Sequence, residues 1–283
     1  MKSIAPLIVI GVLVLATLAC SININAPTVQ TGNEQTVNIN EAVPSGSEVT
    51  QLAIQMGAGN LNIAPGAQDL VQGTIQYNVA DWKPTITRDQ KNVRIEQGNL
   101  DQIKVPSSGV INDWNLKLGS SPIDLSISAG AYKGTLDLSG LALTNLSISD
   151  GASQSEVRFD APNPTDMQRL QYKTGASEVK LLNIGNANTS AVSFESGAGS
   201  YTLNFSGELK KDMSVSIRSG VSSIEIIVPN GVPCRVVITG GLNNVTPTGT
   251  WTISSNTYEK SGSGPRIDIN LEMGLGNLEL VNQ

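Results

Sequence analysis

The 283-residue sequence contains no histidine, the side chain that proteins use most often as a general base and as a metal ligand. No Asp-x-Asp-x-Asp run of the kind found in calcium loops occurs either. The Gly-x-Gly runs that begin at Gly57 and Gly197 lack the rest of a dinucleotide-binding fingerprint. We therefore predict no catalytic residue, no cofactor and no metal site, and we do not expect an enzyme.

Positive charge and cysteine are scarce as well. The 18 Lys and Arg residues are outnumbered by 24 Asp and Glu residues, which gives a net charge of −6. An acidic chain without a basic stripe repels phosphate backbones, so no nucleic-acid partner is expected. The two cysteines are Cys20 and Cys234. Cys234 alternates with the apolar residues Val236 and Ile238, which predicts that it is a small buried side chain.

Aromatic residues make up only 4% of the chain and charged residues 15%, whereas glycine occurs 28 times. Many glycines among abundant Ser, Thr and Asn favour short strands joined by turns over a helical bundle. After residue 20 no window sustains an apolar stripe of helical period. The composition therefore predicts an all-β fold.

Residues 1–19 are expected to form a leader. After Lys2, the run from Ile4 to Ala19 is uncharged and mostly apolar, but shorter than the roughly 20 residues that a spanning helix needs. It ends at Ala19-Cys20, which resembles the lipobox of bacterial lipoproteins, although Thr17 stands where that motif prefers Leu. We expect lipidation of Cys20; an uncleaved anchor or an ordinary secretory peptide is the alternative.

Four parts are expected along the chain. Residues 1–19 are predicted to be a signal peptide, and residues 20–48 a lipidated Cys20 with a flexible linker, since this stretch is too polar to offset its ordering entropy. Within it, Val37-Asn38-Ile39 suggests one short strand. Residues 49–120 are predicted to be an irregular N-terminal β region or cap, and residues 121–283 solenoid repeats.

An internal repeat is the strongest signal in the sequence. The pattern apolar-x-apolar-x-x-Gly, followed by Ala, Val or Leu, recurs about every 22 residues between Gly130 and Gly241. A second apolar alternation follows most of these glycines. The pattern marks eight corner glycines: Gly57, Gly130, Gly151, Gly175, Gly197, Gly220, Gly241 and Gly274.

Each repeat is long enough for one solenoid coil of two short strands and two turns. Glycine would supply either a positive φ or a tight corner where a Cβ would clash, and the residue after it would pack inward. Stacked coils would bury their alternating apolar side chains against one another. We therefore predict a single-stranded parallel β-solenoid (β-helix) of about 22-residue coils; a β-sandwich of hairpins is the alternative.

Two segments interrupt the repeat. The segment from Val71 to Leu118 holds Trp82 and Trp114 and is expected to cap the stack or insert a long hairpin, because an end repeat must close an open stack. Trp251 and Tyr258 are expected to do the same near the C-terminus.

The Gly-Ala corners behind a lipoprotein leader resemble the DUF4097 "putative adhesin" and toast-rack group of bacterial β-solenoid domains. The resemblance covers residues 121–281, and more loosely residues 51–281. It implies a right-handed solenoid and a role in the envelope or at the surface, and it transfers no catalytic residues.

We therefore expect a non-catalytic envelope lipoprotein, outside the cytoplasm and anchored in the membrane by lipid. It would act as an adhesin-like or scaffold module for a glycan or an envelope protein. One alternative is an envelope-stress regulator that docks on a membrane partner. The other is a polysaccharide-acting enzyme, which needs a carboxylate pair in a groove. Its nearest candidates are expected to lie on a solvated face: Asp150, Glu156, Asp160 and Asp166.

Overall fold

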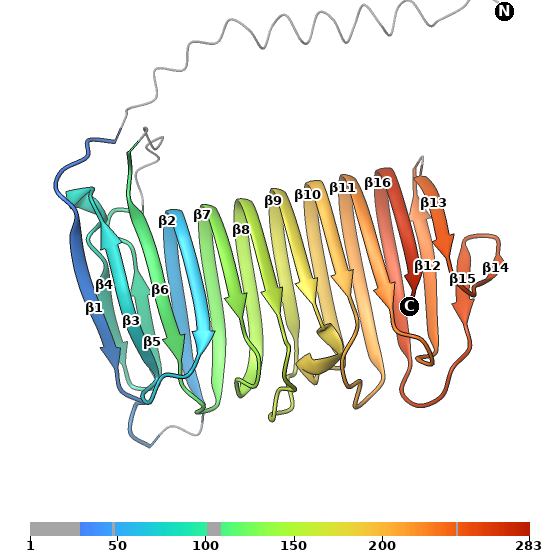
Figure 1. Cartoon of the computed structure of the whole chain (residues 1–283), viewed down its shortest axis with the longest axis horizontal. Helices are drawn as coiled ribbons and strands as arrows, with labels where there is room; N and C mark the ends of the chain where they lie inside the picture. The colour runs from blue at the N-terminus through green and yellow to red at the C-terminus, as the bar shows by residue number, and fades with distance from the viewer. Residues whose placement is uncertain (1–28, 47–48, 101–108, 242) are drawn as a thin grey trace, which may run out of the picture.

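The computed structural model of the chain describes residues 29–46, 49–100, 109–241 and 243–283. These residues form one 16-stranded sheet that winds into a solenoid (Figure 1). Their helical content is two short 3-10 turns, η1 (Ala80–Trp82) and η2 (Ile184–Ala187). No helix within the described ranges is long and apolar enough to cross a membrane. The predicted all-β solenoid is confirmed, whereas the signal peptide and Cys20 lie outside the described residues.

Seven long parallel strands form the body of the stack, and Figure 1 shows them side by side. Each bends at its corner glycine into a first limb, before the glycine, and a second limb, after it. The seven strands are β2 (Thr50–Pro65), β7 (Ile123–Asp137), β8 (Leu143–Arg158), β9 (Leu170–Leu182), β10 (Ala191–Asn204), β11 (Met213–Val228) and β16 (Ile267–Asn282).

The expected two short strands per coil are corrected to one long bent strand. Between β10 and β11 the ladder pairs Ser196 with Ser219 and then Ala198 with Val221, so that only the glycines between them are left out. The strand can continue because the bend takes up little more than one residue. Hydrogen bonding between neighbouring coils is therefore almost unbroken around the corner.

The core lies between the two limbs and consists of columns of aligned side chains. One column runs along the first limb, and each strand contributes one apolar residue to it: Leu52, Leu125, Leu146, Leu170, Val192, Val215, Ile269 and Val236. Cys234 is buried in the next position of its strand, as predicted, and burial raises the pKa of its thiol to about 12. Phe194 bridges the core between Tyr172 and Tyr201, with ring centroids 5.8 Å and 5.1 Å away.

Buried asparagine side chains hydrogen-bond to backbone carbonyls in the loops that connect one coil to the next. The Asn163 amide donates to the Leu143 carbonyl at 2.8 Å, and the Asn186 amide donates to the Phe159 carbonyl at 2.7 Å. Each bond joins successive turns of the stack, so these amides replace a backbone ladder that the irregular loops cannot form.

The order of the last coils differs from their order in the sequence. The C-terminal strand β16 lies between β11 and β12 (Cys234–Gly240), and β13 (Asn243–Thr248) pairs with the second limb of β16. The long gap between the last two corner glycines holds the hairpin of β14 (Thr252–Ser254) and β15 (Thr257–Lys260), which pairs antiparallel with β12. This hairpin lies at the C-terminal end of the sheet (Figure 1).

At the N-terminal end the coil splits into separate strands. On the first limb, β5 (Asn92–Glu96) pairs parallel with β2 and antiparallel with β4 (Thr85–Asp89). On the second limb, β6 (Asn112–Leu118) pairs parallel with β2 and antiparallel with β3 (Val71–Tyr77). The outermost strand is β1 (Gln35–Glu41), which pairs antiparallel with β3.

Strand β1 corrects the extent of the predicted linker over residues 20–48. Its inward-facing Ile39 is buried at 3% exposure, and Val37 packs against the same core. Val29, further upstream, is buried beside Val79 and Trp82. These few apolar side chains are enough to order a polar segment because β3 offers a free edge.

Candidate binding surface

All eight predicted corner glycines lie in one column along the bend, in the order of the coils in space. A Cβ on Gly175 would lie 2.4 Å from the carbonyl oxygen of Gly151, and one on Gly197 would lie 2.6 Å from that of Gly175. At the corner glycines other than Gly57, the backbones thus approach too closely for any side chain. Of the two reasons considered for these glycines, the close approach applies, since positive φ values occur instead at other positions such as Gly199.

The residue after each corner glycine points outward, contrary to the expectation that it packs inward. The inward positions lie one residue before the glycine and two residues after it, which leaves the glycine and its successor on the outside. An exposed apolar ridge results, made of Ala131, Ala152, Ala176, Ala198, Val221 and Leu275. An envelope-stress regulator that docks on a membrane partner would need an apolar contact surface, and this ridge could provide it.

Asp150 is buried inside the corner, which corrects the prediction that it lies on a solvated face. Its carboxylate accepts hydrogen bonds from the hydroxyls of Tyr172 at 2.7 Å, Ser153 at 3.1 Å and Ser177 at 3.3 Å, and also from Thr174. Four hydroxyl donors replace water around one buried carboxyl group. The cluster belongs to the interior and has a structural role.

The other three acidic candidates lie apart from Asp150, on the outside. Glu156 and Asp160 approach the guanidinium of Arg158 at 3.9 Å and 3.4 Å, and Asp166 pairs with Lys211. Val157 and Phe159, between them, are buried as predicted. Within the described chain, no group of three acidic or thiol side chains could hold a metal ion.

One nucleophile motif escaped the sequence analysis, Ser177-Glu-Val-Lys180, a Ser-x-x-Lys run. Residues three apart on a strand face opposite sides. Accordingly, Ser177 is buried beside Asp150, whereas Lys180 is exposed on the outer face. The motif therefore brings no lysine to the serine.

A groove on the first limb has two carboxylates in its lining, as the enzyme alternative requires. It lies between the β4–β5 hairpin and β7, has a volume of about 430 Å³, and is lined by Asp89 and Asp124 together with Arg94. Asp124 accepts a hydrogen bond from the Asn145 amide at 3.3 Å.

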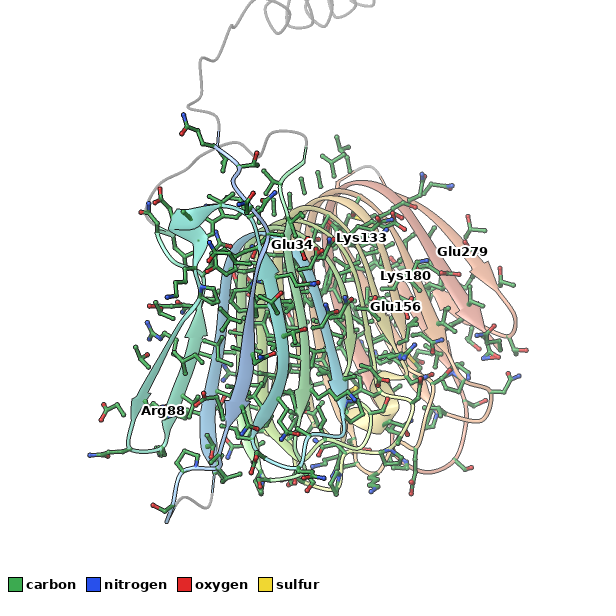
Figure 2. The ribbon with its side chains drawn as sticks, turned by 60° about the vertical axis from the view of Figure 1, so that its left-hand side comes forward. Glu34, Arg88, Lys133, Glu156, Lys180 and Glu279 are labelled. Atoms are coloured by element: carbon green, nitrogen blue, oxygen red, sulfur yellow. The ribbon has the colours of Figure 1, made fainter. Side chains whose placement is uncertain are left out.

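The outer face of the second limb is a continuous polar surface. Figure 2 shows Lys133, Glu156, Lys180 and Glu279 on this face of the solenoid. Toward the N-terminal end its side chains become amides and hydroxyls. The Asn62 side-chain amide donates to the side-chain oxygen of Asn115 at 2.9 Å.

A hollow of about 740 Å³ lies in this amide-rich part of the face. It extends over five neighbouring strands, from β3 to β8. We call it the amide hollow. Its polar lining consists of Asn62, Gln72, Thr74, Asn115, Lys117, Thr135, Asp137 and Arg158.

The charges at one edge of the amide hollow are mostly paired. Arg158 donates to the Asp137 carboxylate at 3.0 Å. Burial acts to raise the pKa of Asp137, but hydrogen bonds from Ser139 and Arg158 outweigh it and hold that pKa below its ordinary value. Asp137 is therefore ionised near neutral pH, and its charge is balanced within the protein.

The geometry defines the class of protein: a parallel β-solenoid with hairpins at both ends and a hollow on one polar face. A family model for the N-terminal domain of toast_rack, DUF2154, matches residues 26–181 and 163–227. The chain belongs to this family. No curated protein matches the sequence.

Two solved structures resemble the chain in fold. A putative cell adhesion protein from Clostridium sporogenes is 22% identical over 89% of this chain and 99% of its own, with a TM-score of 0.49. A putative adhesin from Bacteroides fragilis is 12% identical over 88% of this chain and 97% of its own, with a TM-score of 0.40.

Proposed function

We propose that this protein is a non-catalytic, adhesin-like module of the cell envelope that binds glycans in the amide hollow. The observation that carries the proposal is the hollow itself, about 740 Å³ in volume, whose lining includes amide and hydroxyl side chains. An amide group both donates and accepts hydrogen bonds, as a sugar hydroxyl does. Asn62 and Asn115 present two such groups on neighbouring strands.

The regular strands suit a polymeric ligand. Neighbouring strands lie about 4.8 Å apart, so equivalent side chains recur at a fixed interval across the face. A chain of sugar rings, which also repeats its hydroxyls regularly, would meet similar partners at each strand. The hollow has no aromatic side chain in its lining, so each sugar is expected to bind weakly and the polymer to bind through several contacts.

The lipid anchor is part of the proposal. Acylated Cys20 would tie the chain to the outer side of a membrane, since two or three acyl chains hold a protein stably where one does not. Cys20→Ala should release the protein from the membrane fraction, and mass spectrometry of the N-terminal peptide should show the acyl groups. Retention of the Cys20→Ala variant in the membrane, with the leader intact, would favour the uncleaved anchor.

Glycan binding is tested with the full chain in detergent, immobilised and probed with cell-wall and capsular polysaccharides. We expect binding that Asn62→Ala combined with Asn115→Ala weakens several-fold. Gln171→Ala, an amide on the first limb, is the matched control and should leave binding unchanged. Equal loss in the control, or capture of an envelope protein with no glycan bound, would contradict the proposal.

The absence of catalysis is tested on the same polymers. We expect each bound glycan to be recovered at its original length, because the amide hollow contains one carboxylate, Asp137, and Arg158 already pairs with it. Release of fragments that stops in Asp89→Asn or Asp124→Asn would instead assign the first-limb groove to an enzyme.

A further inference from the structure

We infer that the glycan bound in the amide hollow carries carboxylate groups and that Lys117 is the residue that binds them. This inference rests on the proposed function and adds the chemical class of the ligand. It depends on the position of Lys117, on the pairing of the charges around it and on the charge of the whole chain.

Lys117 stands on the outer face of β6, within the lining of the hollow. Its neighbours in the sequence, Leu116 and Leu118, are buried, which turns the lysine outward, where it is exposed. In the sheet it lies between Gln72 of β3 and Ala64 of β2. The short side chain of Ala64 leaves the ammonium group accessible from the hollow.

Other charged groups near the hollow are held by neighbouring side chains. The Asp113 carboxylate accepts from the Asn60 amide at 2.6 Å, and Asp137 accepts from Arg158. Arg158 is shared among three carboxylates, those of Asp137, Glu156 and Asp160. Among the described residues, Lys117 has no ion pair within 4.0 Å, so its charge is available to a ligand.

A carboxylated sugar would match this arrangement on two sides. Its carboxylate accepts from the Lys117 ammonium, and its ring hydroxyls remain for the amides of Asn62 and Asn115. The net charge of −6 disfavours densely charged polyanions, which the whole molecule repels. A weakly charged glycan with spaced carboxylates experiences the local attraction with less of this repulsion.

The experiment compares partly esterified polygalacturonate, which keeps spaced carboxylates, with its full methyl ester, which has the same backbone without the charge. The full chain in detergent should bind the partly esterified polymer more tightly, by about five-fold, as expected for an exposed ion pair. Lys117→Gln should reduce binding to the level of the ester and leave ester binding unchanged. Lys117→Arg should keep the preference, and so should Lys180→Gln, an exposed lysine outside the hollow.

The outcomes separate this inference from the proposed function. Equal affinity for the two polymers, or binding of neutral glycans without the partly esterified polygalacturonate, would contradict the carboxylate ligand and leave glycan binding intact. A sulfated polymer that binds equally well would show general attraction of anions and would also contradict it. Failure of every glycan to bind would contradict the proposed function itself.

Discussion

At the scale of single residues, the corner glycines differ in what surrounds them. A Cβ on Gly175 would meet a backbone carbonyl at 2.4 Å, which cannot move without shifting a whole coil. A Cβ on Gly57 would meet the side-chain nitrogen of Gln97 at 3.0 Å, and a side chain can turn aside. The same substitution is therefore expected to have different costs at the two positions.

Gly175→Ala should lower the free energy of unfolding by about 2–3 kcal/mol, as strain in a packed core does. Gly57→Ala should cost less than half as much. Urea unfolding followed by circular dichroism measures both, with Ala176→Ser, at the exposed neighbouring position, as the control. Equal costs for the two glycine variants would show that the backbone approach is not what requires glycine.

The stability of the protein at high pH is expected to depend on Tyr132. Burial raises the pKa of its phenol to about 12, partly offset by hydrogen bonding to Tyr172. The neutral form is thus favoured in the folded state, so its stabilising effect is complete below about pH 10 and is lost as pH rises toward 12. The free energy of unfolding should fall over this range, and it should fall less steeply in the Tyr132→Phe variant. Identical slopes in urea titrations at pH 9 to 12 would refute this.

The sequence identified the glycine positions and the inward alternation because both are local properties. The predicted orientations of Asp150 and of the residue after each glycine were wrong because the geometry of the bend decides which way those side chains point. A buried acid can be recognised only when the hydroxyls of Tyr172, Ser153 and Ser177, which come from two coils, are seen to surround it.

At the scale of elements, two amides take the place of a missing corner at the N-terminal end. Gln97 follows β5, and Asn112 begins β6, where a continuous coil would have its bend. The Gln97 side-chain oxygen accepts from the backbone N–H of Gly57 at 2.9 Å, and the Asn112 amide donates to the carbonyl of Ala58 at 2.6 Å and to Gln97 at 2.8 Å. These bonds saturate the first glycine corner.

Asn112→Ala should therefore destabilise the cap by about 2–4 kcal/mol, since several buried polar groups, including the Trp114 indole N–H, lose their partner. Hydrogen exchange should show faster exchange in β2 and β6, with little change in β10 and β11. Asn115→Ala, an exposed amide on the same strand, is the control and should leave exchange unchanged. Uniform exchange across all coils would contradict a local role for the cap.

The placement of β16 between β11 and β12 could not be predicted, because both strands carry the same repeat pattern and either fits beside β11. The unequal spacing of the last glycines was the only sign. Strand β1 was partly foreseen from Val37 and Ile39, but its antiparallel pairing depends on β3, which the repeat does not mark.

At the scale of the whole molecule, a hairpin lies at each end of the stack, and the two limbs present two broad polar faces. Pro247 in β13, which lacks an N–H, weakens the open edge at the C-terminal end as a template for further strands. The exposed faces are thus available for recognition. The amide hollow forms where antiparallel β3 joins parallel β6, a junction that sequence spacing does not show.

The central claim is that ligands bind to the amide hollow on the second limb. Hydrogen exchange of the full chain with and without a bound polysaccharide tests it most directly. We predict slower exchange in β3, β6 and the second limb of β2, with no change on the first limbs of β9 to β11. Protection confined to the first-limb groove around Asp89 and Asp124, or to the ridge at Val221 and Leu275, would contradict the account.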